Sequence, residues 1–412
     1  MSPAARAANP ALQRCIGIPV DEFAAQYWGR RALLSSGDDP ARFADLFSSD
    51  AVDELLAERA LRTPFLRMAK EGEVTPASRF TSSGGYGAEV ADQVDSAKVL
   101  AEFAAGSTIV LQGLHRTWPP LVAFTRALVH ELGHPAQVNA YVTPAASRGF
   151  DSHYDVHDVF VLQVAGEKRW VIHEPVHELP FADEPWSQHA DAVAARASAE
   201  PAIDTVLKPG DALYLPRGWL HSATALGGTT VHLTIGMPAV TRSDLARELV
   251  SGLLRSPALR ESLPIGIDVA NPDELRPHLD AVAAELSRLL ERGTVDAPGI
   301  AATLGTRSSA KTRPEPVRPL ATVDAIAALA PDRLVRWRDG LDAGVALDGD
   351  RAVLQLPGRV IRFPASCAEA LQALLDGAAT PAGALAGLDE ADSLTISRRL
   401  LREAVVVLAA QP

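Results

Sequence analysis

The sequence of 412 residues has few cysteines, few lysines and no long apolar run. Its two cysteines, Cys15 and Cys367, lie near opposite ends of the chain, so they cannot form the disulfide framework of a small secreted protein. No stretch approaches the roughly 20 apolar residues that span a bilayer, and no signal-peptide-like run follows the first residues. We therefore expect a cytoplasmic protein without a membrane segment.

Positive charge is also in short supply. The sequence contains 39 Lys and Arg residues and 51 Asp and Glu residues, which gives a net charge of −12. Because proteins bind nucleic-acid backbones mainly through Lys and Arg, we expect no direct sequence-specific nucleic-acid binding. An acidic surface instead favours a basic protein as partner.

Length and composition predict a globular protein with more than one core. The sequence is 47% hydrophobic and 22% charged, which is ordinary for soluble domains, and 412 residues exceed one comfortable core. Changes of pattern divide the chain into residues 1–240, a helical region with a linker at 241–318, and a C-terminal domain at 319–412.

Residues from about 106 to 238 resemble short strands separated by turns, a pattern typical of a sandwich or barrel. Two helices are expected beside them, over Phe43–Leu61 and Pro120–Leu132. The expected strands are Thr108–Gln112, Gln137–Val142, Asp158–Val164, Lys168–His173, Ala212–Leu215 and Thr230–Ile235.

After Pro238 the apolar residues follow a helical period. One helix is predicted after an N-cap at Ser243, and a second presents Leu279, Val282, Leu286, Leu289 and Leu290 on one face. Such faces must be buried against a partner or the next domain. Thr303–Pro319 is predicted to be a linker. The helices and strands predicted beyond it, which indicate a winged-helix-like domain, are Val323–Leu329, Ala352–Leu356, Arg359–Phe363, Cys367–Leu375 and Ser393–Glu403.

The most informative stretch is residues 149–155, Gly-Phe-Asp-Ser-His-Tyr-Asp. On an extended backbone His153 and Asp155 point to the same face. A second histidine would complete a set of two histidines and one carboxylate, which leaves positions open and suits Fe(II) that binds a cosubstrate and dioxygen. His221 is the best donor, since it follows a Pro-Gly-Asp and Pro-x-Gly pattern in the strand-rich region. Taken alone, the His-x-Asp pair would more often be a surface pair at a turn.

Lys168 is the second clue. Residues 158–173 are predicted to form a hairpin with its turn at residues 165–167, which places Lys168 on the inner face with Trp170 and Ile172. A buried ammonium needs an anionic partner or loses its proton, and a dicarboxylic cosubstrate would be such a partner. The alternatives are a lysine that extends to solvent or pairs with a carboxylate of the protein.

Other histidines offer competing interpretations. Residues 173–177, His-Glu-Pro-Val-His, match the zinc-protease pattern, but the proline and the preceding strand-like residues argue against the required helix. His157 is in phase with His153 and Asp155 and could compete as a ligand. His232 is expected to line the pocket or to be buried and hydrogen-bonded.

With these motifs the chain resembles the JmjC-type cupin oxygenases, specifically the branch that hydroxylates ribosomal proteins. The matching segments span residues 100–240, and the later helices match the family's domain order more loosely. These segments are Val138–Pro144, His153–Phe160, Gln163–Trp170, Leu215–His221 and Val231–Thr234.

The resemblance implies a mainly β catalytic core, a double-stranded β-helix of the cupin type, with a helical dimerisation region and a winged-helix-like domain. It implies Fe(II) held by His153, Asp155 and His221, and 2-oxoglutarate held at its distal carboxylate by Lys168, assisted by Asn139 and Tyr141. With dioxygen, oxidative decarboxylation of 2-oxoglutarate would be coupled to hydroxylation of a C–H bond. It also suggests a homodimer that acts on a histidine or arginine of a ribosomal protein.

Three alternatives remain open. The same iron chemistry could hydroxylate a peptide natural product, or the protein could be a demethylase. Substrate choice depends on the loops at Arg79–Gly87 and Phe181–Ser198. A ligand-sensing cupin regulator is an alternative of another class, with Arg398, Arg399 and Arg402 as the basic residues of its C-terminal domain. The acidic total charge argues against it, and that cluster is also typical of a solvated helix face.

Overall fold

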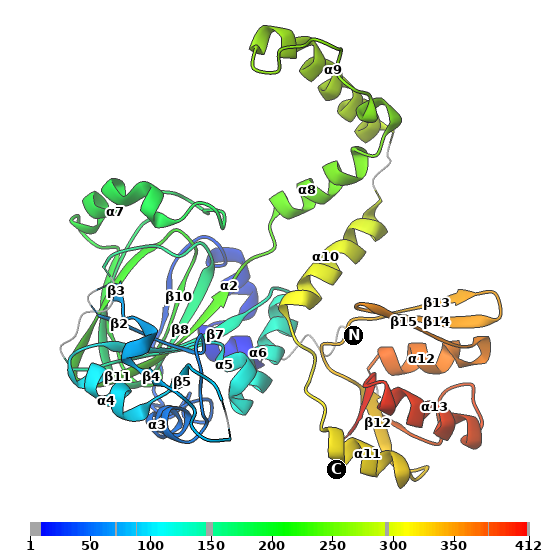
Figure 1. The fold of residues 1–412 in the computed structure, drawn as a ribbon, viewed down its shortest axis with the longest axis horizontal. Coiled ribbons are helices and arrows are strands. Elements are labelled where there is room, and N and C mark those ends of the chain that lie inside the picture. The colour runs from blue at the N-terminus through cyan, green and yellow to red at the C-terminus, as the bar shows by residue number, and fades with distance from the viewer. Residues whose placement is uncertain are drawn as a thin grey trace.

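The computed structural model describes residues 10–70, 72–87, 89–145, 151–292, 296–377 and 379–409 (Figure 1). Gly149 and Phe150 of the predicted metal motif, and the last three residues of the predicted C-terminal domain, lie outside the described residues. The two largest hydrophobic cores are separate in sequence, one between Ala11 and Met237 and one between Leu329 and Val406. None of the described helices is both long and apolar enough to cross a bilayer.

A nine-stranded antiparallel sheet confirms the predicted strand-rich region. Its strands pair in the order β1-β10-β8-β11-β7-β6-β2-β3, with β9 beside β8. Every predicted strand of this region overlaps one of the strands of this sheet, although the strand predicted over Thr108–Gln112 ends one residue earlier, at Leu111. The strands of the sheet are β1 (Leu33–Ser35), β2 (Leu66–Lys70), β3 (Glu73–Val74), β6 (Thr108–Leu111), β7 (Gln137–Thr143), β8 (Asp158–His173), β9 (Ile203–Leu207), β10 (Ala212–Leu215) and β11 (Leu220–Met237).

The predicted hairpin at residues 158–173 is wrong, because β8 runs through this segment as one strand of 16 residues. Gly166 has a φ of +67°, which glycine adopts without strain, and this bends the strand instead of reversing it. On the partner strand β11, residues 227–230 lie opposite Gly166 alone and form a bulge. The glycine-containing pattern at residues 165–167, which predicted a turn between two strands, is therefore a bend within β8.

The bend lets both long strands line one internal pocket. Val159 and Val161 face the pocket before Gly166, whereas Lys168 and Trp170 face it after Gly166, so the inward positions change from odd to even. On β11, residues from both sides of the bulge line the same pocket. The sheet therefore folds back over itself around this pocket.

Helices of the first 132 residues pack on the outside of the sheet. They are α1 (Pro10–Ile16), α2 (Val20–Gln26), α3 (Ser49–Ala57), α4 (Ser96–Ala104), α5 (Leu114–Thr117) and α6 (Pro119–Leu132), the last of which confirms the predicted helix. The helix predicted over Phe43–Leu61 is shorter than expected. Ser48 accepts a hydrogen bond from the backbone N–H of Ala51 and so starts α3, while Phe43 and Phe47 fill the core from a turn.

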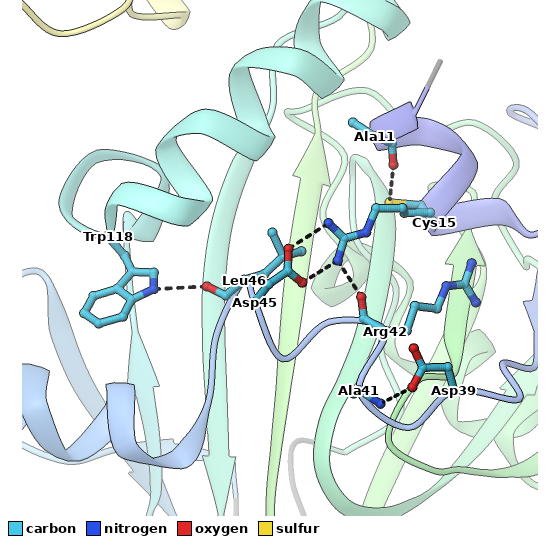
Figure 2. A network of polar contacts seen from close by, with 9 residues as sticks. Ala11, Cys15, Asp39, Ala41, Arg42, Asp45, Leu46 and Trp118 are labelled. Carbon is cyan, nitrogen blue, oxygen red and sulfur yellow. Dashed lines mark hydrogen bonds and ion pairs between the residues drawn. The ribbon is translucent and has the colours of Figure 1, made fainter. Parts of the chain in front are cut away.

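Polar contacts tie the segment before α3 to its neighbours (Figure 2). Arg14 of α1 forms an ion pair with Asp45 at 2.6 Å and also donates to the backbone carbonyl of Arg42. On the other side, the indole N–H of Trp118 donates to the carbonyl of Leu46 at 3.0 Å. These contacts join α1 and the turn at Trp118 to the segment before α3.

The helical region after the sheet contains α8 (Arg242–Leu253), α9 (Pro272–Glu291) and α10 (Ala297–Lys311), which extend away from the sheet in Figure 1. The N-cap is Thr241, not the predicted Ser243, because Thr241 and Asp244 form a reciprocal capping box. The linker predicted over Thr303–Pro319 is wrong up to Lys311, since α10 continues that far and its Arg307 pairs with Glu248 of α8 at 2.7 Å.

Residues from Pro319 onward form a second unit with its own core. The predicted helices and the predicted strand pair are present. Four strands were missed, namely β12, β13, β16 and β17. Of these, β13 is an exposed edge strand with little apolar alternation. The elements are α11 (Pro319–Ala327), β12 (Leu334–Trp337), β13 (Gly344–Asp348), β14 (Arg351–Leu356), β15 (Arg359–Pro364), α12 (Ala368–Leu375), β16 (Thr380–Pro381), α13 (Glu390–Arg402) and β17 (Val406–Leu408).

Candidate metal and cosubstrate site

The structure brings His153, Asp155 and His221 together in the internal pocket. Their ligating atoms lie within 4.8 Å of one another, and His221 Nε2 lies 3.7 Å from Asp155 Oδ2. Within the described residues, this is the only group of three or more His, Cys, Asp or Glu side chains that could share a metal ion. The pocket has a volume of about 260 Å³.

Backbone hydrogen bonds place the two histidines side by side. The N–H of His153 donates to the carbonyl of His221 at 3.2 Å, and the N–H of His221 donates back at 2.8 Å. Gly218, with a φ of +90°, donates to the carbonyl of Asp155 at 3.0 Å. A Cβ at Gly218 would lie 2.6 Å from the carbonyl oxygen of His177, so this turn requires glycine. The Pro-x-Gly signal of the sequence is thus the turn that positions His221.

Neighbouring carbonyl groups orient both imidazole rings. Nδ1 of His153 lies 2.7 Å from the carbonyl oxygen of Asp151, and Nδ1 of His221 lies 3.2 Å from that of Trp219. When Nδ1–H donates to a carbonyl, the lone pair of Nε2 is left free to bind a metal. Both rings are therefore held in the tautomer that suits a metal ligand.

The ionisation states also suit a metal. The pKa of His221 is lowered to about 4, mainly by burial. The nearby ring of His153 also lowers this pKa, and its effect is larger than the opposite effect of the Asp155 carboxylate. The imidazole of His221 is therefore neutral at pH 7. Burial raises the pKa of Asp155, but the surrounding histidine rings bring that pKa below its ordinary value, so the group is a carboxylate. The neutral imidazole of His221 and the carboxylate of Asp155, together with the imidazole of His153, fit a divalent transition metal such as Fe(II).

Lys168 lies in the same pocket, on the inner face as predicted. Its side chain is only 3% exposed, which excludes a lysine that extends to solvent. Its ammonium donates to Oγ1 of Thr143 at 3.2 Å, and none of the ion pairs between described residues includes it. Burial lowers the pKa of Lys168 to about 8. The pocket therefore offers a buried cation to an anionic ligand.

Aromatic rings form the wall near Lys168. His232 stacks on Tyr141 with ring centroids 5.1 Å apart, and Trp170 meets His232 edge to face at 5.4 Å. His232 is 3% exposed, and its Nδ1 has no hydrogen-bond partner within the described part of the chain. Burial holds the pKa of His232 well below its ordinary value, so this ring is neutral.

Asn139 and Tyr141 differ in their relation to the pocket. Tyr141 lines the pocket, whereas Asn139 is absent from the described lining. The side-chain oxygen of Asn139 instead accepts a hydrogen bond from the backbone N–H of Gly113 at 3.1 Å. Of these two predicted cosubstrate contacts, the structure brings only Tyr141 to the ligand space.

Several polar lining residues were missed from the sequence, namely Arg67, Thr108, Thr143 and Thr234. Thr143 carried a usable signal, because it lies two residues after Tyr141 on β7 and therefore on the same face. Arg67 did not, because only the pairing of β2 with β6 places it beside the pocket.

The competing metal motif is wrong. His173 ends β8 and its Nε2 lies 3.2 Å from the carbonyl oxygen of Ala199, while His177 contacts Glu184 at 3.1 Å from a loop. The two histidines therefore do not share a helix face. His157 is not part of the metal group, and its buried Nδ1 has no hydrogen-bond partner among the described residues.

Residues 119–245 match the family described as the JmjC domain. Rat Ribosomal oxygenase 1 is 30% identical over 222 residues, which cover 53% of this chain and 35% of the rat protein. The bifunctional lysine-specific demethylase and histidyl-hydroxylase NO66 of Drosophila persimilis is 34% identical over 173 residues, which cover 37% of this chain and 23% of that protein. The chain thus spans only part of the length of these relatives.

The ribosomal oxygenase YcfD from Escherichia coli, in complex with cobalt and succinic acid, has the same fold. The TM-score is 0.51 at 17% sequence identity, and the superposition covers 96% of this chain and 99% of YcfD. The large antiparallel sheet with its flanking helices is accordingly the JmjC cupin fold that the resemblance implied.

Proposed function

We propose that this protein is an Fe(II)- and 2-oxoglutarate-dependent protein hydroxylase. The observation that carries the proposal is one pocket that joins a two-histidine, one-carboxylate group to a buried lysine without a carboxylate partner among the described ion pairs. A ligand with a metal-binding end and a distal carboxylate has matching groups at both places. YcfD, which shares the fold, has been obtained with cobalt and succinic acid, the latter being the product of 2-oxoglutarate decarboxylation.

Bound Fe(II) would supply the reaction of dioxygen with 2-oxoglutarate that yields succinate and carbon dioxide and hydroxylates a C–H bond. The chain's own residues prepare the site for it. His153, Asp155 and His221 would hold the metal, and a set of three protein ligands would leave coordination positions for the cosubstrate and dioxygen. The carbonyl groups of Asp151 and Trp219 keep both rings in place.

Lys168 is proposed to bind the distal carboxylate of 2-oxoglutarate. The carboxylate would pair with the ammonium, and Thr143 already holds that ammonium at 3.2 Å. The hydroxyl of Tyr141, which was predicted to assist Lys168, lies near Asp155 and Arg67, so Tyr141 is proposed to contact the cosubstrate nearer the metal. Asn139 keeps its proposed role only if its side-chain amide leaves Gly113 when the cosubstrate binds.

The proposed substrate is a basic ribosomal protein, hydroxylated on a histidine or arginine. The net charge of −12 favours a basic partner, and two relatives bear the names Ribosomal oxygenase 1 and histidyl-hydroxylase. A lysine demethylase is a second candidate, because the name of the NO66 relative also includes that activity.

We further propose that the chain is a homodimer through its helical region. Helix α9 has no buried side chain, and its apolar residues Leu279, Val282 and Leu290 are 56%, 40% and 44% exposed. A helix with an apolar face of this kind needs a partner. The division at residues 240 and 318, the winged-helix-like nature of the last unit and a cytoplasmic location belong to the same proposal.

Intact-mass analysis of ribosomal proteins tests the substrate. Ribosomal proteins from cells that lack the gene are incubated with purified enzyme, Fe(II), 2-oxoglutarate and dioxygen, and succinate is measured in parallel. We expect one protein to gain the mass of one oxygen, and an enzyme with Asp155→Ala to leave it unchanged. Steady succinate formation with no added oxygen in any ribosomal protein would contradict the substrate but not the cosubstrate.

A further inference from the structure

Arg67 is a second cation in the pocket, and the proposed chemistry does not use it. Four directly opposed residues of neighbouring strands form one row across the sheet, in the order Arg67, Val110, Tyr141 and His232. Directly opposed residues of antiparallel strands project from the same face, so Arg67 and Tyr141 share one row on the inner face. The guanidinium of Arg67 donates a hydrogen bond to the hydroxyl of Tyr141, while its buried Nε–H has no partner among the residues that the structure describes.

The Arg67 and Tyr141 end of this row lies toward the metal triad, whereas His232 at its other end lies near both Lys168 and His221. Thr143, which holds Lys168, lies two residues beyond Tyr141 on β7, a displacement of roughly 7 Å. Burial raises the pKa of the Tyr141 hydroxyl, and the nearby carboxylate of Asp155 raises it further, whereas Arg67 lowers it. The Tyr141 hydroxyl therefore lies near both Asp155 and Arg67. A target side chain that approaches the metal enters the neighbourhood of Arg67.

The described lining has nothing to neutralise a cationic target. Asp155 is the only carboxylate among the described residues that line the pocket, and it belongs to the metal triad. The guanidinium of an arginine or the ammonium of a methylated lysine would lie near Arg67 without a free carboxylate. Burying an unpaired cation beside a second cation is costly, whereas a neutral imidazole has no such cost.

We propose that Arg67 is a specificity-determining residue that excludes cationic side chains from the metal end of the pocket, so that the enzyme hydroxylates histidine rather than arginine or methylated lysine. This inference rests on the proposed function and narrows its substrate. The free Nε–H of Arg67 is also a donor for a carbonyl oxygen of the bound peptide.

The test begins with total protein from cells that lack the gene, so that it does not depend on a ribosomal target. Wild-type enzyme, Fe(II), 2-oxoglutarate and dioxygen are added, and fragment mass spectra locate each new oxygen. We expect the new hydroxyl groups on histidine. A peptide that contains the modified site is then compared with its histidine-to-arginine counterpart, and we expect wild type to turn over the arginine peptide about tenfold more slowly or worse.

Charge variants separate specificity from structure. Arg67→Glu should raise turnover of the arginine peptide relative to the histidine peptide by about tenfold, while Arg67→Lys, which keeps the charge, should keep the wild-type preference. Lys70→Glu is the matched control, because it makes the same charge change on an exposed residue of β2 that does not line the pocket. Unchanged 2-oxoglutarate binding shows that each variant is folded, and Arg67→Gln replaces Arg67→Glu if the latter is not.

Hydroxyarginine or demethylated lysine as the main wild-type product would overturn the role of Arg67 while leaving the oxygenase intact. An unchanged peptide preference in the folded Arg67→Glu or Arg67→Gln variant would overturn it as well. Loss of 2-oxoglutarate binding by the wild type would instead overturn the proposed function itself. Intact binding with no new hydroxyl group on any protein would contradict both.

Discussion

Lys168 combines deep burial with a charge, and this combination gives the pocket its preference for a dicarboxylate. Replacing it by alanine should weaken 2-oxoglutarate binding by roughly a hundredfold, because one partner of a buried charge pair is lost. Binding of Mn(II) in place of Fe(II) should change little, since Lys168 is not a metal ligand. Calorimetric titration measures both, with the exposed Lys208→Ala as control. Normal 2-oxoglutarate binding by Lys168→Ala would show that the anchor lies elsewhere.

The same residue predicts a pH dependence. The pKa of Lys168 in the free protein is about 8, lowered by burial from 10.5, and only the protonated form attracts a carboxylate. The affinity for 2-oxoglutarate should therefore fall as the pH rises above about 8, and binding at such pH should take up a proton.

Calorimetry in buffers of different ionisation enthalpy measures that proton uptake. Lys168→Arg, which stays charged throughout this range, serves as the comparison and should bind without proton uptake. A wild-type affinity that stays constant between pH 7 and pH 9 would contradict the assignment.

The sequence was most informative where one local pattern determines the geometry. His153 and Asp155 are two residues apart, and His221 follows a turn that only glycine can make, so their convergence could be predicted. Asn139 was placed on the correct strand, but its hydrogen bond to Gly113 comes from a distant loop. Arg67 could not be found, because the register between β2 and β6 depends on contacts that no local pattern records.

At the scale of elements, the bend in β8 decides whether two halves of one strand can line the same pocket. A Cβ at Gly166 would lie 2.4 Å from the carbonyl oxygen of Thr229, so the bulge of β11 would have to move. Gly166→Ala should therefore lower the free energy of unfolding by about 2 to 4 kcal/mol, as measured by urea denaturation.

Gly227→Ala is the matched control for this change. Gly227 also has a positive φ, of 75°, but a Cβ there would meet nothing within 4 Å. Gly227→Ala should lower the free energy of unfolding only by the backbone strain of an alanine at positive φ, about 1 to 2 kcal/mol. Equal losses for the two substitutions would mean that contact with the bulge does not constrain Gly166.

The elements that the sequence mispredicted share a physical cause. A glycine between two β-branched runs is compatible with a reversal or a bend, and only the bulge at residues 227–230 of the partner strand selects the bend. Likewise, the Ser- and Thr-rich start of the predicted linker forms part of α10, whose N-cap is Asp296 and whose Arg307 pairs with α8. Tertiary partners overrode the local preference in both cases.

At the scale of the whole molecule, the apolar face of α9 predicts the oligomeric state. Leu279→Glu with Val282→Glu should convert a dimer into a monomer in sedimentation experiments, because it places charges in the proposed interface. Binding of 2-oxoglutarate should survive, since the pocket is lined by residues of the sheet and its nearby loops. Val360→Glu, on the exposed surface of the C-terminal unit, should leave the dimer intact. A wild-type monomer at micromolar concentration would contradict this interface.

The whole molecule has two parts with separate cores, one of residues up to Met237 that contains the pocket and one after residue 328. The chemistry belongs to the first of them, and its decisive test precedes any search for substrate. We would titrate 2-oxoglutarate into the full chain under anaerobic conditions, with Mn(II) in place of Fe(II), for the wild type and for Asp155→Ala. We predict binding that requires the metal and is lost in Asp155→Ala. A folded, metal-loaded wild type that does not bind 2-oxoglutarate would contradict the oxygenase function.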